Sequence, residues 1–123
     1  MIITAGSAAH FTCVEDAGAI IVTFVRQQLT DEDNLEQVGE ALFALVEKDA
    51  QSRIILDLSQ LDYITSSVLG KFITLHRRLH RQGGTLVLCG IQPNVRESLR
   101  ASRLLDYFQT ADTIDAAHAA LSL

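Results

Sequence analysis

Two short runs of apolar residues constrain the fold of this chain more than any other feature. They are "RIILDL" (residues 53–58) and "TLVLCGI" (residues 85–91), and a stretch with helical periodicity follows each of them. A short continuous apolar run is typical of a strand that is covered on both faces. Strands that alternate with helices form a mostly parallel sheet with helices packed against it. The two runs therefore predict an α/β fold.

The N-terminal part predicts a β-hairpin. The runs at residues 11–15 and 19–25 are strand-like, and Asp16, Ala17 and Gly18 between them form a connection of hairpin length. This hairpin makes the predicted sheet mixed. The expected order is β-β-α-β-α-β-α-(β)-α, a mixed sheet of four to five strands flanked by about four helices. With 123 residues, the chain is expected to form one domain over residues 1–123.

Helix signals divide the rest of the chain. Asp33 and Glu36 form a capping pattern before the first helix, whose inward face is Leu35, Val38, Leu42, Leu45 and Val46. A second helix is predicted from residue 66 to 82, where a Gly-Gly pair ends it. Pro93 is placed to open a third helix. Residues 106–109 are read as a short edge strand, and Asp112 as the cap of a last helix that turns Ile114, Ala117 and Leu121 inward.

The composition argues against several classes of function. The net charge is −5 and the pI is near 5.2, which disfavours nucleic acid as a partner because phosphate binding needs a basic surface. No apolar run reaches the roughly 18 residues of a membrane helix, and the first ten residues lack a basic leader region. We therefore expect a cytoplasmic protein that does not bind a membrane. Cys13 and Cys89 lie in separate strand-like runs and are expected to be free buried thiols.

No pattern in the sequence predicts an enzyme. Neither serine of the "TSS" triplet lies in the G-x-S-x-G turn of a hydrolase, and no histidine is marked out as its base. His76 and His80 have a spacing that can bind zinc, but the segment reads "HRRLH" and indicates no third ligand. They are interpreted as residues at the boundary of the core. No catalytic residue, metal site or cofactor is predicted.

The triplet Thr65, Ser66 and Ser67 stands where a predicted strand passes into a predicted helix. One hydroxyl is sufficient to cap the helix, and Asp62 is a further candidate for this role. A phosphate at this point would add about 1.5 to 2 negative charges, which the helix N-terminus tolerates. The domain would then stay folded, whereas a partner bound at this corner would meet a new charge. The triplet therefore also fits a phosphorylation switch.

The ordered segments "IILDLSQLDYITSSVLG" and "GGTLVLCGIQPNVRESLRASRLLDYFQTADTIDAA" resemble the STAS domain of bacterial anti-sigma-factor antagonists. The resemblance implies a non-enzymatic module that binds an anti-sigma factor, often a serine kinase with a GHKL-type ATP fold. It places the phosphorylated residue at Ser66, with Ser67 and Thr65 as alternatives. Thr65 and Val68 depart from the pattern, which commonly has Asp before the acceptor and a small residue two positions after it.

The surface that would bind the partner is expected to comprise Asp62, Tyr63, Thr65, Ser66, Ser67 and Gly70. The acidic cluster at residues 31–33 could join it, although a solvated helix cap is the favoured explanation of that cluster. Two other roles of STAS domains stay open. One is a stressosome-like scaffold in which the domains self-associate, and the other is a subunit of a lipid-transport complex.

Overall fold

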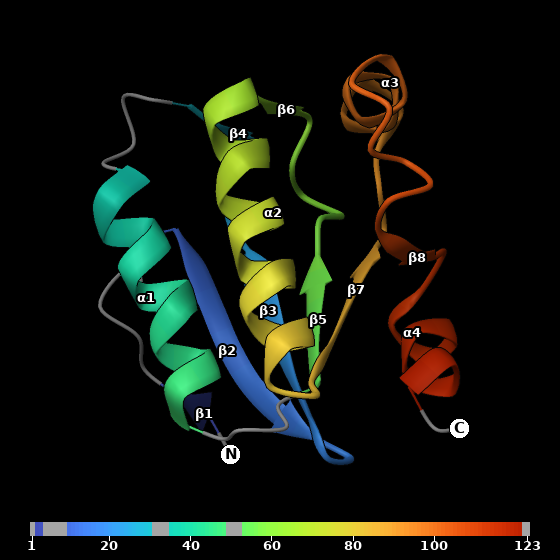
Figure 1. Cartoon of the computed structure of the whole chain (residues 1–123). Coiled ribbons are helices and arrows are strands. Elements are labelled where there is room, and N and C mark those ends of the chain that lie inside the picture. The colour runs from blue at the N-terminus through green and yellow to red at the C-terminus, as the bar shows by residue number, and fades with distance from the viewer. Residues whose placement is uncertain (1, 4–9, 31–34, 49–52, 122–123) are drawn as a thin grey trace.

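The computed structural model describes residues 2–3, 10–30, 35–48 and 53–121 of the chain, and Figure 1 shows its arrangement. Its main sheet has six strands in the order β1-β2-β3-β5-β7-β8. The strands are Ile2–Ile3 (β1), Phe11–Asp16 (β2), Ala19–Phe24 (β3), Arg53–Asp57 (β5), Thr85–Cys89 (β7) and Gln109–Ala111 (β8). β1 and β3 run antiparallel to β2, whereas β3, β5, β7 and β8 are parallel. The predicted mixed α/β fold is confirmed.

The hairpin between β2 and β3 turns at Ala17 and Gly18, whose φ angles are 51° and 82°. Two consecutive residues with positive φ match the right-handed twist of a tight antiparallel hairpin. From β3 the chain enters the parallel part of the sheet. There Ile55 lies between Ile21 of β3 and Val87 of β7, and all three are buried.

The two faces of the sheet carry different helices. In Figure 1, α1 (Leu35–Lys48) and α2 (Ser66–Arg81) lie side by side over one face. α4 (Ile114–Leu121) packs against β5, β7 and β8, where Ala117 and Leu121 are buried, as predicted. α3 (Pro93–Ala101) follows β7 and begins with Pro93 in its first turn, also as predicted.

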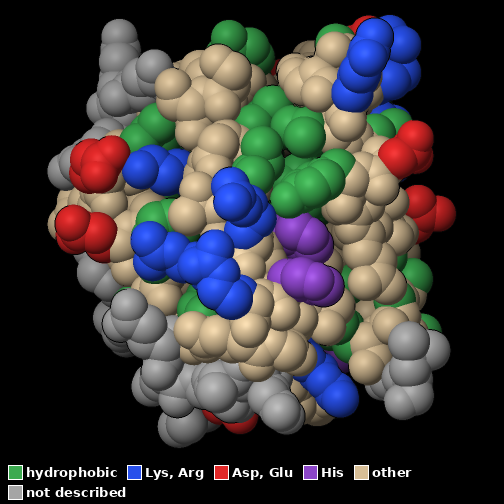
Figure 2. Space-filling model, in the orientation of Figure 1, with side chains coloured by type: hydrophobic (Ala, Val, Ile, Leu, Met, Phe, Trp, Pro, Cys, Tyr) green, Lys and Arg blue, Asp and Glu red, His purple; other side chains and the backbone are tan. Residues whose placement is uncertain are grey.

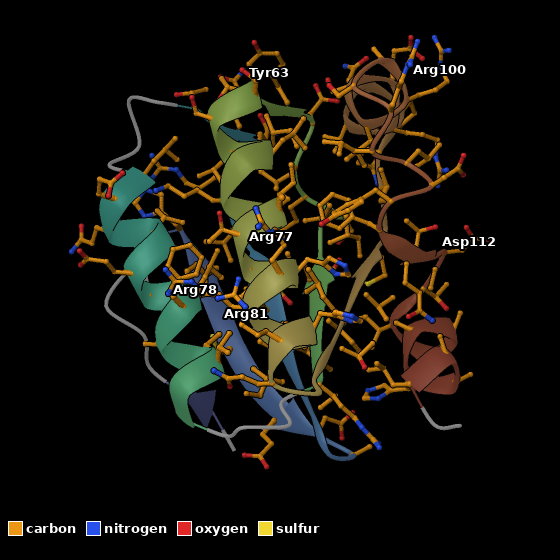
Figure 3. The ribbon with its side chains drawn as sticks, in the orientation of Figure 1. Tyr63, Arg77, Arg78, Arg81, Arg100 and Asp112 are labelled. Atoms are coloured by element: carbon orange, nitrogen blue, oxygen red, sulfur yellow. The ribbon has the colours of Figure 1, made fainter. Side chains whose placement is uncertain are left out.

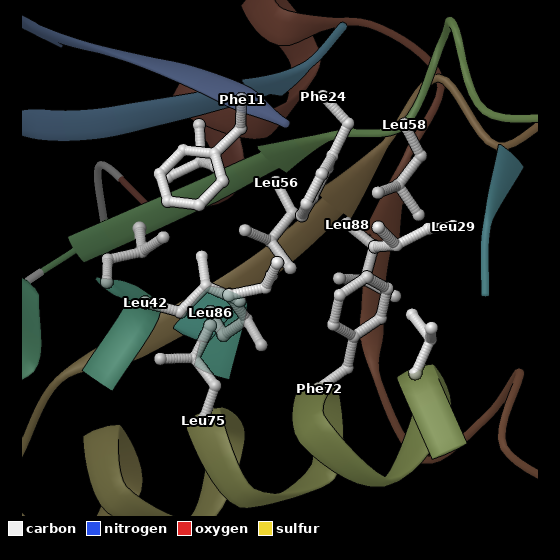
Figure 4. Close-up of a cluster of buried hydrophobic side chains, with 14 of the residues drawn as sticks. Phe11, Phe24, Leu29, Leu42, Leu56, Leu58, Phe72, Leu75, Leu86 and Leu88 are labelled. Carbon is white, nitrogen blue, oxygen red and sulfur yellow. The ribbon is translucent and has the colours of Figure 1, made fainter. Parts of the chain in front are cut away.

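The larger hydrophobic core lies between the sheet and the pair α1 and α2 (Figure 4). The ring of Phe24 stands 5.7 Å from that of Phe11 and 5.8 Å from that of Phe72, measured between centroids, so β2, β3 and α2 meet through three aromatic side chains. An edge-to-face contact such as that between Phe11 and Phe24 adds about 0.5–1.5 kcal/mol beyond the burial of area. The residues of α2 predicted to face the core are buried, namely Val68, Phe72, Leu75 and Leu79.

Two local predictions near the C-terminus were wrong. The last strand is Gln109–Ala111 rather than residues 106–109, because the chain turns back at this point and Tyr107 and Phe108 donate backbone hydrogen bonds to the carbonyl of Leu104. The cap of α4 is Thr113 rather than Asp112, since the Oγ1 atom of Thr113 accepts a hydrogen bond of 3.1 Å from the amide of Ala116. The predicted cap of the first helix at Asp33 lies outside the described residues.

A second, two-stranded sheet was not predicted. β4 (Gln28–Leu29) pairs in parallel with β6 (Tyr63–Ile64). Each strand has only two residues, which is too short to produce a readable alternation of apolar and polar side chains. The pair ties the segment after β3 to the segment before α2, and so positions the candidate site.

Candidate functional site

The candidate site lies at the end of the molecule where the parallel strands finish. In Figure 1 this is the upper end, where the segments after β3 and β5 meet the N-terminus of α2 and the α3 helix. Ligands of open α/β sheets characteristically bind at the carboxyl ends of the strands. The fold brings the hydroxyl triplet at residues 65–67 to this end of the sheet.

The loop that leaves β5 is fixed by hydrogen bonds to its neighbours. The amide of Leu58 donates to the carbonyl of Cys89 at 2.9 Å, which extends the contact between β5 and β7 by one residue. The buried side chain of Asp57 accepts a bond of 3.0 Å from the amide of Ser59 and turns the chain. Burial, followed by the charge of Asp57, raises the pKa of the Cys89 thiol to about 11. Cys13 and Cys89 are both buried thiols that form no disulfide, as predicted.

Asp62 and Tyr63 are held by two different parts of the chain. Their amides donate to the carbonyl of Gln27 at 2.6 and 3.2 Å, and the side-chain amide of Asn94 donates to Oδ1 of Asp62 at 3.3 Å. The loop is thus bonded to the segment before β4 and to the first turn of α3. Tyr63 stays 49% exposed, and Figure 3 shows it at the end of the molecule beside the start of α2.

The three hydroxyl residues stand at the start of α2 in different environments. Thr65 is half-buried and occupies the N-cap position, with φ −92° and ψ 167°, but its side chain makes no capping hydrogen bond. Ser66 and Ser67 form the beginning of the first turn and are exposed. This turn contains no acidic residue, so the positive end of the helix dipole has no carboxylate of its own turn beside it.

The next residues of α2 divide between the core and the surface. Val68 is 1% exposed and Leu69 is 4% exposed, so both belong to the core. Gly70 faces solvent, and a Cβ atom added there would meet nothing within 4 Å. The structure thus brings together on one surface the six residues predicted to bind a partner, Asp62, Tyr63, Thr65, Ser66, Ser67 and Gly70.

Sequence reasoning overlooked Asn94 as a neighbour of this surface. Its position in the first turn of a helix that follows a parallel strand could have indicated it, because such helices begin at the same end of the sheet. Among the residues that the structure describes, no group of three His, Cys, Asp or Glu side chains is arranged to hold a metal ion. Over the same ranges, no helix combines the length and hydrophobicity needed to cross a membrane.

The sequence and the structure both resemble known proteins. Residues 14–117 match the model of the STAS domain family. BtrV of Bordetella bronchiseptica, a protein named as a candidate anti-sigma factor antagonist, is 38% identical over 94 residues, which are 76% of this chain and 80% of BtrV.

Solved structures share the fold at lower sequence identity. A STAS-domain anti-sigma-factor antagonist from Planctomyces limnophilus has a TM-score of 0.85 at 19% identity and covers 92% of this chain and 98% of its own. The antagonist SpoIIAA in its unphosphorylated form has a TM-score of 0.75 at 20% identity, with 92% and 97% covered. The phosphorylated form of SpoIIAA from Bacillus has a TM-score of 0.68 at 20% identity, with 90% and 98% covered.

The STAS family model matches most of the chain, and BtrV is 38% identical to it over 76% of its length. The overall fold agrees with that of the solved STAS structures. The chain therefore belongs to the STAS domain family, which also includes proteins named as anti-sigma factor antagonists.

Proposed function

We propose that this protein is a non-enzymatic binding module that antagonises an anti-sigma factor. Its kinship with BtrV supports the role, and the arrangement of the exposed surface at the start of α2 supports the location of the contact. The observation that carries the proposal is the pair of exposed serines, Ser66 and Ser67, in a helical turn without acidic residues. A partner that covers this turn would bury accessible hydroxyls at the N-terminus of a helix.

The partner in this proposal is an anti-sigma factor that is also a serine kinase with a GHKL-type ATP fold. It would phosphorylate Ser66, with Ser67 and Thr65 as the alternative acceptors. A phosphate at Ser66 adds about 1.5 to 2 negative charges and three acceptor oxygens. The amides of the first turn and the dipole of α2 favour these charges, so the modification leaves the domain folded. The same charges oppose a partner that fits the unmodified turn.

Tyr63 is the best anchor for the partner on this surface. It combines a large exposed ring with a backbone that Gln27 holds in place, and ordered aromatic residues contribute strongly to interfaces. Gly70 lets a partner approach the helix closely because no side chain stands there. Val68, which departs from the family pattern, is part of the core, so its extra volume is directed away from the partner.

The test begins with affinity capture from the source cell and identification of the recovered kinase by mass spectrometry. The purified kinase is then incubated with ATP and this protein, and the modified residue is mapped. We expect phosphate on Ser66 and its absence from the Ser66→Ala variant. Modification outside residues 65–67 would contradict the proposed switch, and recovery of only further copies of this chain would favour the scaffold role.

The Ser66→Asp variant tests the effect of charge on binding. We expect it to weaken binding to the captured kinase by about tenfold or more, because a carboxylate imitates part of the phosphate charge. Its Tm should stay close to that of the natural protein, since an acidic residue in the first turn suits the helix dipole. The isosteric Ser66→Cys variant is the control and should keep binding. A large fall in the Tm of Ser66→Asp would show instead that the hydroxyl has a structural role.

A further inference from the structure

The opposite end of α2 borders a surface hollow that the proposed function does not use. It has a volume of about 460 Å³ and is lined by His76, Arg77, His80, Arg81 and Tyr107. The first four residues belong to the C-terminal half of α2, and Tyr107 belongs to the segment between α3 and β8. Figure 2 shows the histidines between a hydrophobic patch on one side and Lys and Arg side chains on the other.

One wall of the hollow is aromatic and held in place. The ring of Tyr107 lies edge-on to His76, with 5.0 Å between their centroids, and edge-on to Phe108 at 5.1 Å. His76 also contacts Phe108, at 5.8 Å. These contacts restrain Tyr107, yet 43% of it stays exposed. An incoming apolar side chain would therefore meet an ordered ring and lose little conformational entropy in the protein.

The other wall carries uncompensated positive charge. α2 holds four of the chain's ten Lys and Arg residues and no Asp or Glu. Lys71 pairs with Glu36 at 3.0 Å, and the guanidinium of Arg78 stacks over Phe43 at 4.1 Å. Arg77 and Arg81 instead line the hollow, and no ion pair joins either of them to another residue within the described ranges. In a protein of net charge −5, this local positive charge is complementary to an acidic ligand.

The two histidines contribute imidazole rings to the lining of the hollow. Nδ1 of His76 is buried and has no hydrogen-bond partner in the described part of the chain. Burial and, to a smaller extent, the charge of His80 lower the pKa of His76, so its imidazole is neutral at pH 7. The lining residues include no carboxylate, although Asp106 adjoins Tyr107 in the sequence. Among the described residues, no third His, Cys, Asp or Glu joins this pair in an arrangement that could hold a metal ion.

We propose that this hollow binds an acidic segment of a partner protein. Carboxylates of the segment pair with Arg77 and Arg81, whose planar guanidinium groups can each donate two parallel hydrogen bonds. An aromatic or aliphatic side chain of the segment packs against Tyr107. The volume suits a few residues, since ligand sites commonly measure about 300–1,000 Å³. This site is separate from the surface at Ser66 and does not depend on the proposed sigma-factor role.

The test uses the full chain and three fluorescent ten-residue peptides. The first contains glutamates and aspartates around one phenylalanine, the second replaces every acid by its amide, and the third replaces the phenylalanine by alanine. Fluorescence anisotropy should show that the affinity of the first peptide is higher than that of the second by about tenfold or more. Added salt should lower the affinity of the first peptide. The third should bind with intermediate affinity. Equal binding of the first and second peptides would overturn the proposal.

Matched variants locate the binding on the protein. The double change Arg77→Gln and Arg81→Gln should lower the affinity for the acidic peptide by about fivefold or more, because each exposed ion pair contributes modestly. Arg78→Gln removes the same charge from the same helix on the side of Phe43 and should leave affinity unchanged. An equal loss in both variants would show non-specific attraction. Sedimentation of the unliganded protein would overturn the choice of occupant if it revealed a dimer that the double change dissolves.

Discussion

At the scale of single residues, two glycines illustrate how the site is built. Gly90 follows β7 with a φ of 66°, and a Cβ atom there would lie 3.0 Å from Cβ of Ser59 and 3.2 Å from Oδ1 of Asp57. The backbone conformation therefore favours glycine, because a side chain adds strain at positive φ, and the close contacts leave little room for a Cβ atom. Gly70 lies in the exposed face of α2 with open space around it. There, glycine only weakens the helix.

The two glycines predict opposite effects on stability. Gly90→Ala should lower the free energy of unfolding by about 1–2 kcal/mol, the cost of a left-handed residue with a side chain, with a further loss if Ser59 must move. Gly70→Ala should raise it by about 0.5–1 kcal/mol, since alanine is the better helix former. Urea unfolding monitored by circular dichroism measures both.

Each glycine serves as the control of the other in this comparison. A loss of stability in Gly70→Ala would contradict the open surroundings described for that residue. If the proposed contact at the start of α2 is right, the more stable Gly70→Ala protein should nevertheless bind its partner more weakly, because the added methyl group keeps the partner away.

Cys89 predicts how stability depends on alkaline pH. Its pKa is raised from 9.0 to about 11 in the folded protein, so the unfolded chain loses this proton at lower pH. Below pH 9 the thiol is protonated in both states and has no effect. Between about pH 9 and 11 only the unfolded state is ionised, so the free energy of unfolding falls as pH rises. Denaturant titrations across this range should show a steeper fall for the natural protein than for Cys89→Ala. Parallel curves would contradict the shifted pKa.

At the scale of elements, α4 depends on a cap that differs from the expected one. The hydroxyl of Thr113 accepts a hydrogen bond from the amide of Ala116, and α4 packs against the sheet. Thr113→Ala should therefore cost about 0.5–2 kcal/mol of stability in urea unfolding. Asp112→Ala removes the cap that the sequence favoured and should change stability by less than about 0.5 kcal/mol. A larger loss of stability in Asp112→Ala than in Thr113→Ala would show that Asp112 is the cap.

The main elements could be predicted because each leaves a pattern that covers many residues. The apolar runs of β5 and β7 and the helical periodicity of α2 each rest on several side chains. By contrast, the strands β4, β6 and β8 are only two or three residues long, and their positions depend on hydrogen bonds to distant segments. The amides of Asp62 and Tyr63 bond to Gln27, and no local pattern records that contact.

At the scale of the whole molecule, the hydroxyl triplet lies at an end of the sheet, as the predicted topology implies, with Ser66 and Ser67 exposed and Thr65 half-buried. The triplet is readable because a strand-to-helix junction must lie at an end of the sheet. The hollow at the far end of α2 was not predicted. His76 and His80 were interpreted as boundary residues, which describes the partly buried His76 but not the exposed His80. The aromatic neighbour of His76, Tyr107, comes from a segment that was interpreted as an edge strand. Long-range packing of irregular segments is the part that the sequence patterns do not contain.

The length of α2 has a consequence for how the molecule could respond to two ligands. Eleven residues separate Ser66 from Arg77, a rise of about 16 Å along the helix axis. Electrostatic influence across water decays over about 8 Å at physiological ionic strength. A charge placed at the start of α2 is therefore screened before it reaches the arginines. The two ends of α2 would thus bind their ligands independently, so that modification at one end leaves the affinity of the other end unchanged.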